Sequence, residues 1–247
     1  MRTVYSLFLL SLALLVAAPA QAQFGKLKAA ADKAAGMLKN GGNPLSEEEI
    51  GKGLKEALNQ GVDKAVTQLS AEDGYLASPY KILLPEEAQT VINKVSSLPG
   101  FGNLEQDLTE RLNAAAELAA KKATPIFVDA ITGLTIKDAM NLLLGDNDAA
   151  TRYLESSTGG PLANEFRPVI RESLDEVNAN EIWSKAVTAY NRIPFVKKTE
   201  PELDVYVTDR ALEGLFGLIE VKETELRQNP ALRNTDLLKR VFARQDQ

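Results

Sequence analysis

Residues 46–69, SEEEIGKGLKEALNQGVDKAVTQL, decide the fold class of this chain. Ser46 and Glu49 stand at the two positions of a capping box, in which each side chain accepts a hydrogen bond from the other residue's backbone N–H at a helix start. Apolar residues then recur every three or four positions, which is the period of one helix face: Ile50, Leu54, Leu58, Val62, Val66 and Leu69. The stretch therefore predicts a long helix that buries one face.

The same periodicity continues over most of the chain, so the sequence predicts a single all-α, multi-helix domain over residues 44–247. No stretch alternates apolar and polar residues for long enough to indicate a sheet. Most of the expected helix starts are marked by a proline or by a side chain that can cap a helix. These starts lie at or near Pro85, Leu104, Thr135, Asp146-Asn147-Asp148, Pro161, Ala179, Thr208 and Thr235.

Three stretches that contain proline are expected to interrupt the helices. Thr124-Pro125 kinks or ends the helix that begins near Leu104. Residues 156–161, SSTGGP, are expected to form a turn between two helices, with Pro161 at the first position of the second. Residues 193–196, IPFV, are expected to be extended, either as a short β-like run or as a linker.

Residues 1–22 have the pattern of a cleaved export signal. Arg2 precedes an apolar run over residues 7–17, and Ala20-Gln21-Ala22 supplies the small residues that a signal peptidase recognises. The run is shorter than the roughly 20 residues of a membrane span. No cysteine follows the cleavage point, which excludes a lipid anchor there. We therefore expect cleavage after Ala22 and release into the periplasm of a Gram-negative bacterium.

Residues 23–43 are a basic segment ahead of the domain. They contain one acidic residue and four lysines, Lys26, Lys28, Lys33 and Lys39. Apolar residues recur between the lysines at roughly helical spacing, and residues 40–44 then form a flexible break. The segment is either a linker or an amphipathic arm that makes weak contact with an anionic membrane surface.

Charge and missing residue types exclude several function classes. Residues 44–247 carry 23 basic and 33 acidic residues, a balance that disfavours a nucleic-acid partner. The chain has no histidine and no cysteine, which excludes histidine-based catalytic triads, thiolate nucleophiles and the usual zinc sites. We expect no cofactor and no bound metal, so any chemistry would use carboxylate, lysine or tyrosine groups.

Three short motifs each suggest a function, and a structural explanation is favoured for all three. Ser78-Pro79-Tyr80-Lys81 matches the Ser-x-x-Lys pattern of penicillin-binding enzymes, but the strand motif that accompanies it is missing. Asp146-Asn147-Asp148 could ligate calcium, although capping of the following helix explains it without a ligand. Gly159-Gly160 suggests a phosphate cradle but lacks the Gly-Lys-Ser/Thr sequence of a P-loop.

Several separated segments together resemble one bacterial family. They are residues 45–50 (LSEEEI), 125–131 (PIFVDAI), 149–154 (AATRYL), 166–168 (FRP), 190–191 (YN), 194–196 (PFV) and 229–231 (NPA). The chain is in this respect similar to an exported helical family catalogued as domain of unknown function 4197, over about residues 44–243. The resemblance implies the helical fold and the export, and it implies no activity, ligand or catalytic residue.

The polar residues that we single out as a candidate binding site are spread along the second half of the chain. Guanidinium, phenol and amide groups there could bind an anionic ligand or a partner if their segments meet. They are Arg152, Tyr153, Arg167, Tyr190, Asn191, Lys197 and Lys198. The alternative is that the arginines pair with acidic neighbours such as Glu155, Glu165 and Asp175.

Because no catalytic motif remains, the expected function is that of a non-enzymatic binding or interaction module of the cell envelope. Its partner would be an envelope protein or a small ligand. Two alternatives stay open. One is an envelope hydrolase or lyase that uses carboxylate, tyrosine or lysine chemistry, and the other is a carrier whose helices enclose a lipid or another apolar ligand.

Overall fold

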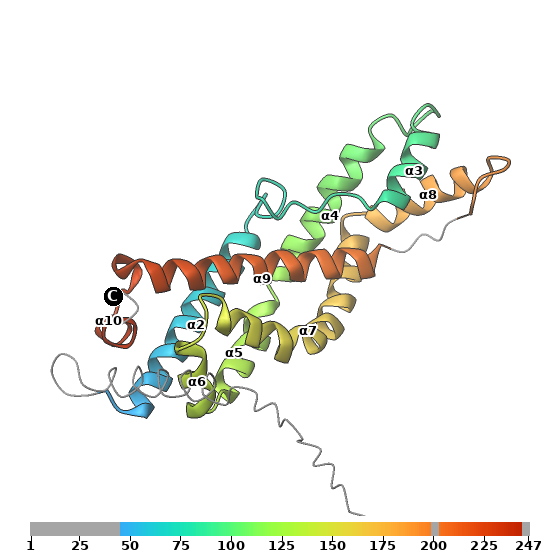
Figure 1. Ribbon diagram of the computed structural model, residues 1–247. Helices are drawn as coiled ribbons and strands as arrows, with labels where there is room; N and C mark the ends of the chain where they lie inside the picture. The colour runs from blue at the N-terminus through green and yellow to red at the C-terminus, as the bar shows by residue number, and fades with distance from the viewer. Residues whose placement is uncertain (1–44, 199–202, 244–247) are drawn as a thin grey trace, which may run out of the picture. The chain divides into compact units, whose positions relative to one another are not determined.

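The computed structural model describes residues 45–198 and 203–243 (Figure 1). The chain divides into two units, Met1–Pro44 and Leu45–Gln247. The expected signal segment and its cleavage after Ala22, and the basic segment at 23–43, lie outside the described residues. The architecture below is that of the second unit.

The described residues form α-helices and one short 3₁₀ turn, with no β-strand among them, which confirms the predicted all-α class. The helices are α2 (Glu47–Leu69), α3 (Glu86–Val95), α4 (Leu104–Ala120), α5 (Ala123–Gly133), α6 (Ile136–Leu143), α7 (Ala149–Glu176), α8 (Ala179–Asn191), α9 (Asp204–Gln228) and α10 (Asp236–Phe242), with the 3₁₀ turn at Pro230–Leu232.

Helices α2 and α9 organise the packing. Helix α9 lies against α7, α2 and α4, and α2 also packs on α5, α6 and α10. Helices α3, α4 and α8 gather toward the end of α9 that lies away from α10 (Figure 1). There α8 packs on α3, α4 and α7. The core is almost entirely aliphatic and aromatic, and its side chains include Ile50, Leu108, Phe127, Phe166 and Leu215.

Local capping chemistry places three of the helix starts where the sequence predicts them. Ser46 Oγ accepts a hydrogen bond from Glu49 N at 3.1 Å, and the Glu49 carboxylate accepts one from Ser46 N at 2.8 Å. The Thr135–Asp138 pair builds the same capping box before α6, and Thr235 caps α10. The expected start near Thr208 is wrong, because α9 begins at Asp204 and the Thr208 hydroxyl donates back to the Asp204 carbonyl at 2.6 Å.

The predicted turn at residues 156–161 is wrong, because α7 continues through Gly159, Gly160 and both of its prolines. A buried stripe with a spacing of four residues runs along the helix through this region: Leu154, Thr158, Leu162, Phe166, Ile170 and Leu174. Burial of this stripe against α9 and α4 outweighs the poor helix propensity of the Gly-Gly-Pro sequence, since tertiary packing supplies most helical stability.

The two other stretches that contain proline, Thr124-Pro125 and residues 193–196, also differ from the prediction. Helix α4 ends at Ala120, so Thr124-Pro125 neither kinks nor ends it, and Pro125 lies in the first turn of α5. Residues 192–195 form a turn rather than an extended or β-like run. Phe195 in this turn has φ +65°, a left-handed conformation that the sequence does not predict.

Candidate functional site

The candidate arginines on α7 lie in separate ion-pair clusters. Arg152 contacts Asp148 at 3.1 Å, Glu155 at 2.9 Å and Glu220 of α9 at 2.7 Å. Arg167 lies 15 residues further along, or about 22 Å at the helical rise of about 1.5 Å per residue, too far to share one small anion with Arg152. Its Nε contacts Asp204 at 3.2 Å. The predicted Arg152–Glu155 pair is confirmed, whereas Arg167 pairs with Asp204 rather than with Glu165 or Asp175.

The remaining candidate residues differ widely in exposure. Tyr153 is half-buried on α7, while Tyr190 is buried and Asn191 half-buried at the end of α8. Lys197 and Lys198 are exposed beyond that helix. The structure therefore distributes the seven residues over α7, α8 and the segment that follows α8.

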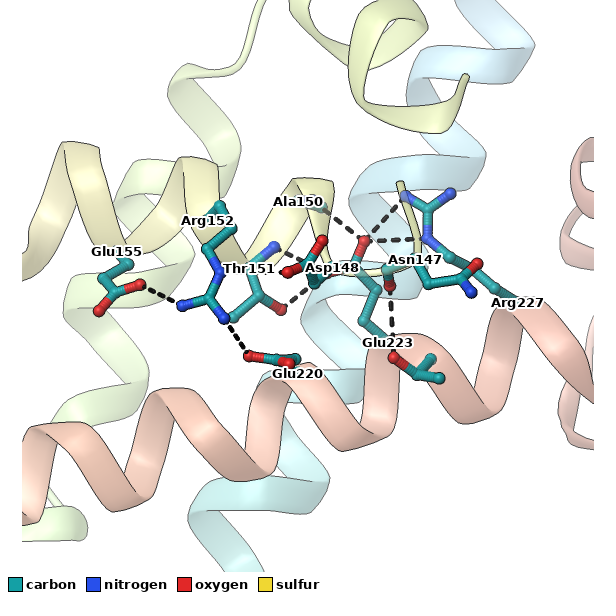
Figure 2. A network of polar contacts seen from close by, with 10 residues as sticks. Asn147, Asp148, Ala150, Thr151, Arg152, Glu155, Glu220, Glu223 and Arg227 are labelled. Atoms are coloured by element: carbon teal, nitrogen blue, oxygen red, sulfur yellow. Dashed lines mark hydrogen bonds and ion pairs between the residues drawn. The ribbon is translucent and has the colours of Figure 1, made fainter. Parts of the chain in front are cut away.

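A buried polar cluster that the sequence does not predict joins α6, α7 and α9, and its contacts between α7 and α9 are drawn in Figure 2. The Glu223 carboxylate accepts hydrogen bonds from Ala150 N at 3.0 Å, and from both Thr151 N and Thr151 Oγ1 at 2.7 Å. These amides are at the start of α7, where the expected cap from Asp146-Asn147-Asp148 is absent, since Asp148 makes no capping bond. Glu223 supplies the negative charge that this helix end requires.

Arg227 completes this cluster, which we call the α6–α7–α9 junction. Its guanidinium pairs with Glu223 at 2.8 Å and donates to Leu143 O at 3.1 Å and to Leu142 O at 2.9 Å. The Arg227 guanidinium thus binds the carbonyls at the end of α6, and the Glu223 carboxylate binds the amides at the start of α7. Because the pair is used in capping two helices, its role is structural.

A small void beside the junction has a volume of about 20 Å³ and is lined mainly by Leu54, Leu58, Ile219 and Phe242, with Arg227 at its polar side. That volume suits about one water molecule. Across residues 45–198 and 203–243, no three acidic side chains gather as a metal-binding group. Within the same ranges no helix combines the length and the apolar character needed to cross a bilayer.

A long connection between α2 and α3, residues 70–85, is held firmly in place. Its sixteen residues exceed the usual upper length of about 12–15 for a connection without secondary structure, and such loops are often functional. Tyr75 is fully buried, and its hydroxyl donates to Ala211 O at 2.8 Å. The Glu117 carboxylate accepts from Tyr75 N at 3.3 Å. Burial raises the pKa of Glu117, and this effect outweighs the backbone hydrogen bonds that favour its charged form.

Asn113 and Gly217 fix the second half of this connection. The buried Asn113 amide accepts from Ile82 N and donates to Ile82 O, both at 2.9 Å. Tyr80 lies against α9, where a Cβ on Gly217 would stand only 2.9 Å from its ring. The absence of a side chain at Gly217 therefore allows the connection to lie close to α9.

An open groove of about 610 Å³ runs between this connection and the first turns of α4. Its lining is mostly polar and includes two acidic residues: Leu76, Lys81, Leu83, Gly102, Asn103, Glu105, Gln106, Thr109 and Glu110. Leu83 is 62% exposed and offers an apolar contact at the rim. A groove of this size, with rigid walls and mixed polarity, can hold an extended polar chain.

Of the Ser-x-x-Lys motif only Lys81 lines this groove, and Ser78 does not have the geometry of a nucleophile. Ser78 Oγ donates to Tyr75 O at 2.9 Å and accepts from Tyr80 N at 3.2 Å, so it closes a turn. The segment is not helical, and Lys81 therefore does not lie one helical turn from that hydroxyl. Lys81 contributes to the groove as a charged wall residue.

The fold and the groove define an all-helical domain with a rigid, irregular connection that lies along one open groove. The model of a family described as "Protein of unknown function (DUF4197)" matches residues 44–243, and the chain belongs to this family. The resemblance noted from the sequence is thereby confirmed. No curated protein and no solved structure matches the chain.

Proposed function

We propose that the protein is a non-enzymatic binding module of the bacterial cell envelope, and that its groove holds an extended, basic segment of a partner protein. The observation that carries the proposal is the connection at residues 70–85. Buried Tyr75 and Asn113 hold this irregular segment on the helices, and its outer side is left open beside α4. Binding residues are commonly placed on long loops that a rigid scaffold positions.

The chemistry of the lining supports a basic partner segment. Glu105 and Glu110 on α4 provide negative charge along one wall, and the other wall carries exposed Leu83 together with the single cation of the lining, Lys81. An extended peptide that carries a lysine or arginine near an apolar side chain would complement both walls. The envelope location rests on the signal pattern of residues 1–22.

The two alternative functions find less support in the geometry. For a carrier, the apolar void beside the junction, with a volume of about 20 Å³, is far smaller than a lipid chain. For a hydrolase or lyase, a carboxyl with a raised pKa is the expected marker. Glu117 has such a pKa, but its carboxylate binds the backbone of residue 75 and does not line the groove.

Selection from a displayed library of linear peptides tests the proposal. Enriched peptides should carry basic and apolar residues, and Glu105→Lys/Glu110→Lys should weaken their binding at least about tenfold, a loss of about 1.4 kcal/mol. Glu172→Lys/Glu176→Lys on α7 is the matched control, because both residues are exposed and the change in net charge is the same. If the peptides bound equally well to both double variants, the groove would not be their binding site. Mass spectrometry of the peptides distinguishes binding from hydrolysis, since a hydrolase would cleave them.

A further inference from the structure

Phe195 is fully exposed and lies in the segment that follows α8, residues 192–198, which we call the α8 turn. Its φ of +65° places a bulky aromatic residue in the left-handed region, where residues with a Cβ are disfavoured. Strained backbone of this kind clusters at functional sites. The turn thus holds an aromatic ring in solvent at a cost in backbone energy, which packing does not explain.

Basic side chains flank this ring on both sides. Arg192 precedes it, and Lys197 and Lys198 follow it; all three are exposed, and no hydrogen bond or ion pair of their side chains joins them to the described chain. The sequence contains no acidic residue from 182 to 199, between Glu181 and Glu200, although the domain as a whole is acidic. The α8 turn therefore combines an apolar centre, Ile193-Pro194-Phe195-Val196, with a cationic border.

We propose that the α8 turn is a membrane-docking site that inserts Phe195 into the interface of an anionic phospholipid bilayer. The apolar centre would enter the boundary between headgroups and acyl chains, where aromatic rings are favoured. Arg192, Lys197 and Lys198 would extend to the phosphates, which attract basic side chains without demanding a fixed geometry.

The cationic border complements an anionic bilayer, and the projecting ring also favours a bilayer over a protein partner. A bilayer receives a projecting ring through its surface and needs no matching cavity, whereas a protein partner would have to supply a pocket for Phe195. The residues concerned are distinct from those of the groove, so either site can fail in experiment without affecting the other.

Vesicle co-sedimentation of the chain without residues 1–22 tests the proposal. The wild type should bind vesicles of phosphatidylethanolamine and phosphatidylglycerol, but not pure phosphatidylcholine. Phe195→Asn keeps a residue type that tolerates positive φ and removes the ring, and it should weaken binding about tenfold. Lys197→Glu/Lys198→Glu should weaken it at least about 25-fold, at roughly fivefold for each lysine near an anionic surface. The basic segment at 23–43 is present in every variant, so differences between variants report on the α8 turn.

Lys121→Glu/Lys122→Glu is the matched control, because this neighbouring pair is also exposed and the variant has the same net charge. It should keep its affinity to within about threefold, since surface attraction falls off within a Debye length. Equal losses in both double variants would indicate diffuse charge attraction and would overturn the proposal. Absence of wild-type binding to the anionic vesicles would overturn it as well.

Depth of insertion provides a second readout. A Phe195→Trp variant should show emission that brominated phospholipids quench, while buried Trp183 remains as an unquenched background. Binding of this variant without quenching would place the ring outside the bilayer, contradict the proposal and favour a protein partner for Phe195.

Discussion

The α6–α7–α9 junction and the α8 turn contain charged groups in opposite surroundings. In the junction, the buried Glu223–Arg227 pair has hydrogen-bond partners at the end of α6 and at the start of α7, the latter drawn in Figure 2. In the α8 turn, Lys197 and Lys198 are exposed beside a ring that contacts solvent. Charged groups in the first region stabilise the fold, and those in the second are available to a partner. Burial and partners, rather than residue type, separate structural from functional charge.

The largest expected effect is at the junction. Arg227→Leu leaves the Glu223 carboxylate buried without its cation, so the free energy of unfolding should fall by about 3–5 kcal/mol. Urea denaturation followed by circular dichroism measures this change. Lys185→Ala is the matched control, because Glu181 and Lys185 have the same i,i+4 order but are exposed on α8. Its unfolding midpoint should hardly move, and a loss for Arg227→Leu no larger than that of the control would remove the distinction between the two regions.

An intermediate effect is expected where the groove wall is anchored. Asn113→Ala leaves the Ile82 N–H and C=O without their partner, and an unsatisfied buried group costs about 1–3 kcal/mol. The same unfolding measurement applies, with Asn93→Ala as the control on an exposed face of α3. Peptides selected on the groove should also bind Asn113→Ala less tightly, because the wall that contains Ile82 is released. An unchanged stability would mean that the connection does not depend on this amide.

A smaller effect of opposite sign is expected in the α8 turn. Phe195→Asn should raise the free energy of unfolding by about 0.5–1 kcal/mol, because asparagine adopts positive φ more readily than phenylalanine. Asn178 has φ +55° and is exposed, so the reciprocal Asn178→Phe variant should lose a similar amount. Loss of stability in Phe195→Asn would show that the ring contributes to folding, and the contrast with the junction would disappear.

The smallest effect concerns pH. The raised pKa of Glu117 means that the folded chain retains this proton at a pH where the unfolded chain has lost it. Ionisation of Glu117 therefore lowers stability as the pH rises above the ordinary pKa of glutamate, about 4.3, since the folded state binds more protons there. Relative to the wild type, Glu117→Gln should gain stability over this rise in pH, as measured by urea denaturation at each pH. A constant difference between the two proteins would contradict the raised pKa.

The sequence predicts those features of the fold that depend on local contacts. The capping boxes at Ser46–Glu49 and Thr135–Asp138 involve residues three apart, so their spacing alone predicts them. The predicted turn at residues 156–161 is wrong, because Gly159-Gly160-Pro161 indicates a break whereas the stripe from Leu154 to Phe166 continues through it. The strength of that stripe depends on burial against α9 and α4, which the sequence does not reveal.

The sequence predicts less of the candidate binding sites than of the fold. Lys197 and Lys198 were recognised as candidates, and they belong to the α8 turn on which the membrane proposal rests. The groove was missed apart from Lys81, which appeared only in the Ser-x-x-Lys motif. A signal for it was present in the length of the irregular stretch before Pro85. Its walls come from segments that only the folded chain brings together.

The sequence by itself determined the helical class, the family and several helix starts of this protein, because periodicity and capping act over one or two turns. The tertiary structure decided which charges are structural. Glu223 is 72 residues from Thr151 in the chain, yet it replaces the local cap of α7 that Asp148 does not supply. The partner of a buried charge depends on which helices pack together, and that choice is made by the whole core.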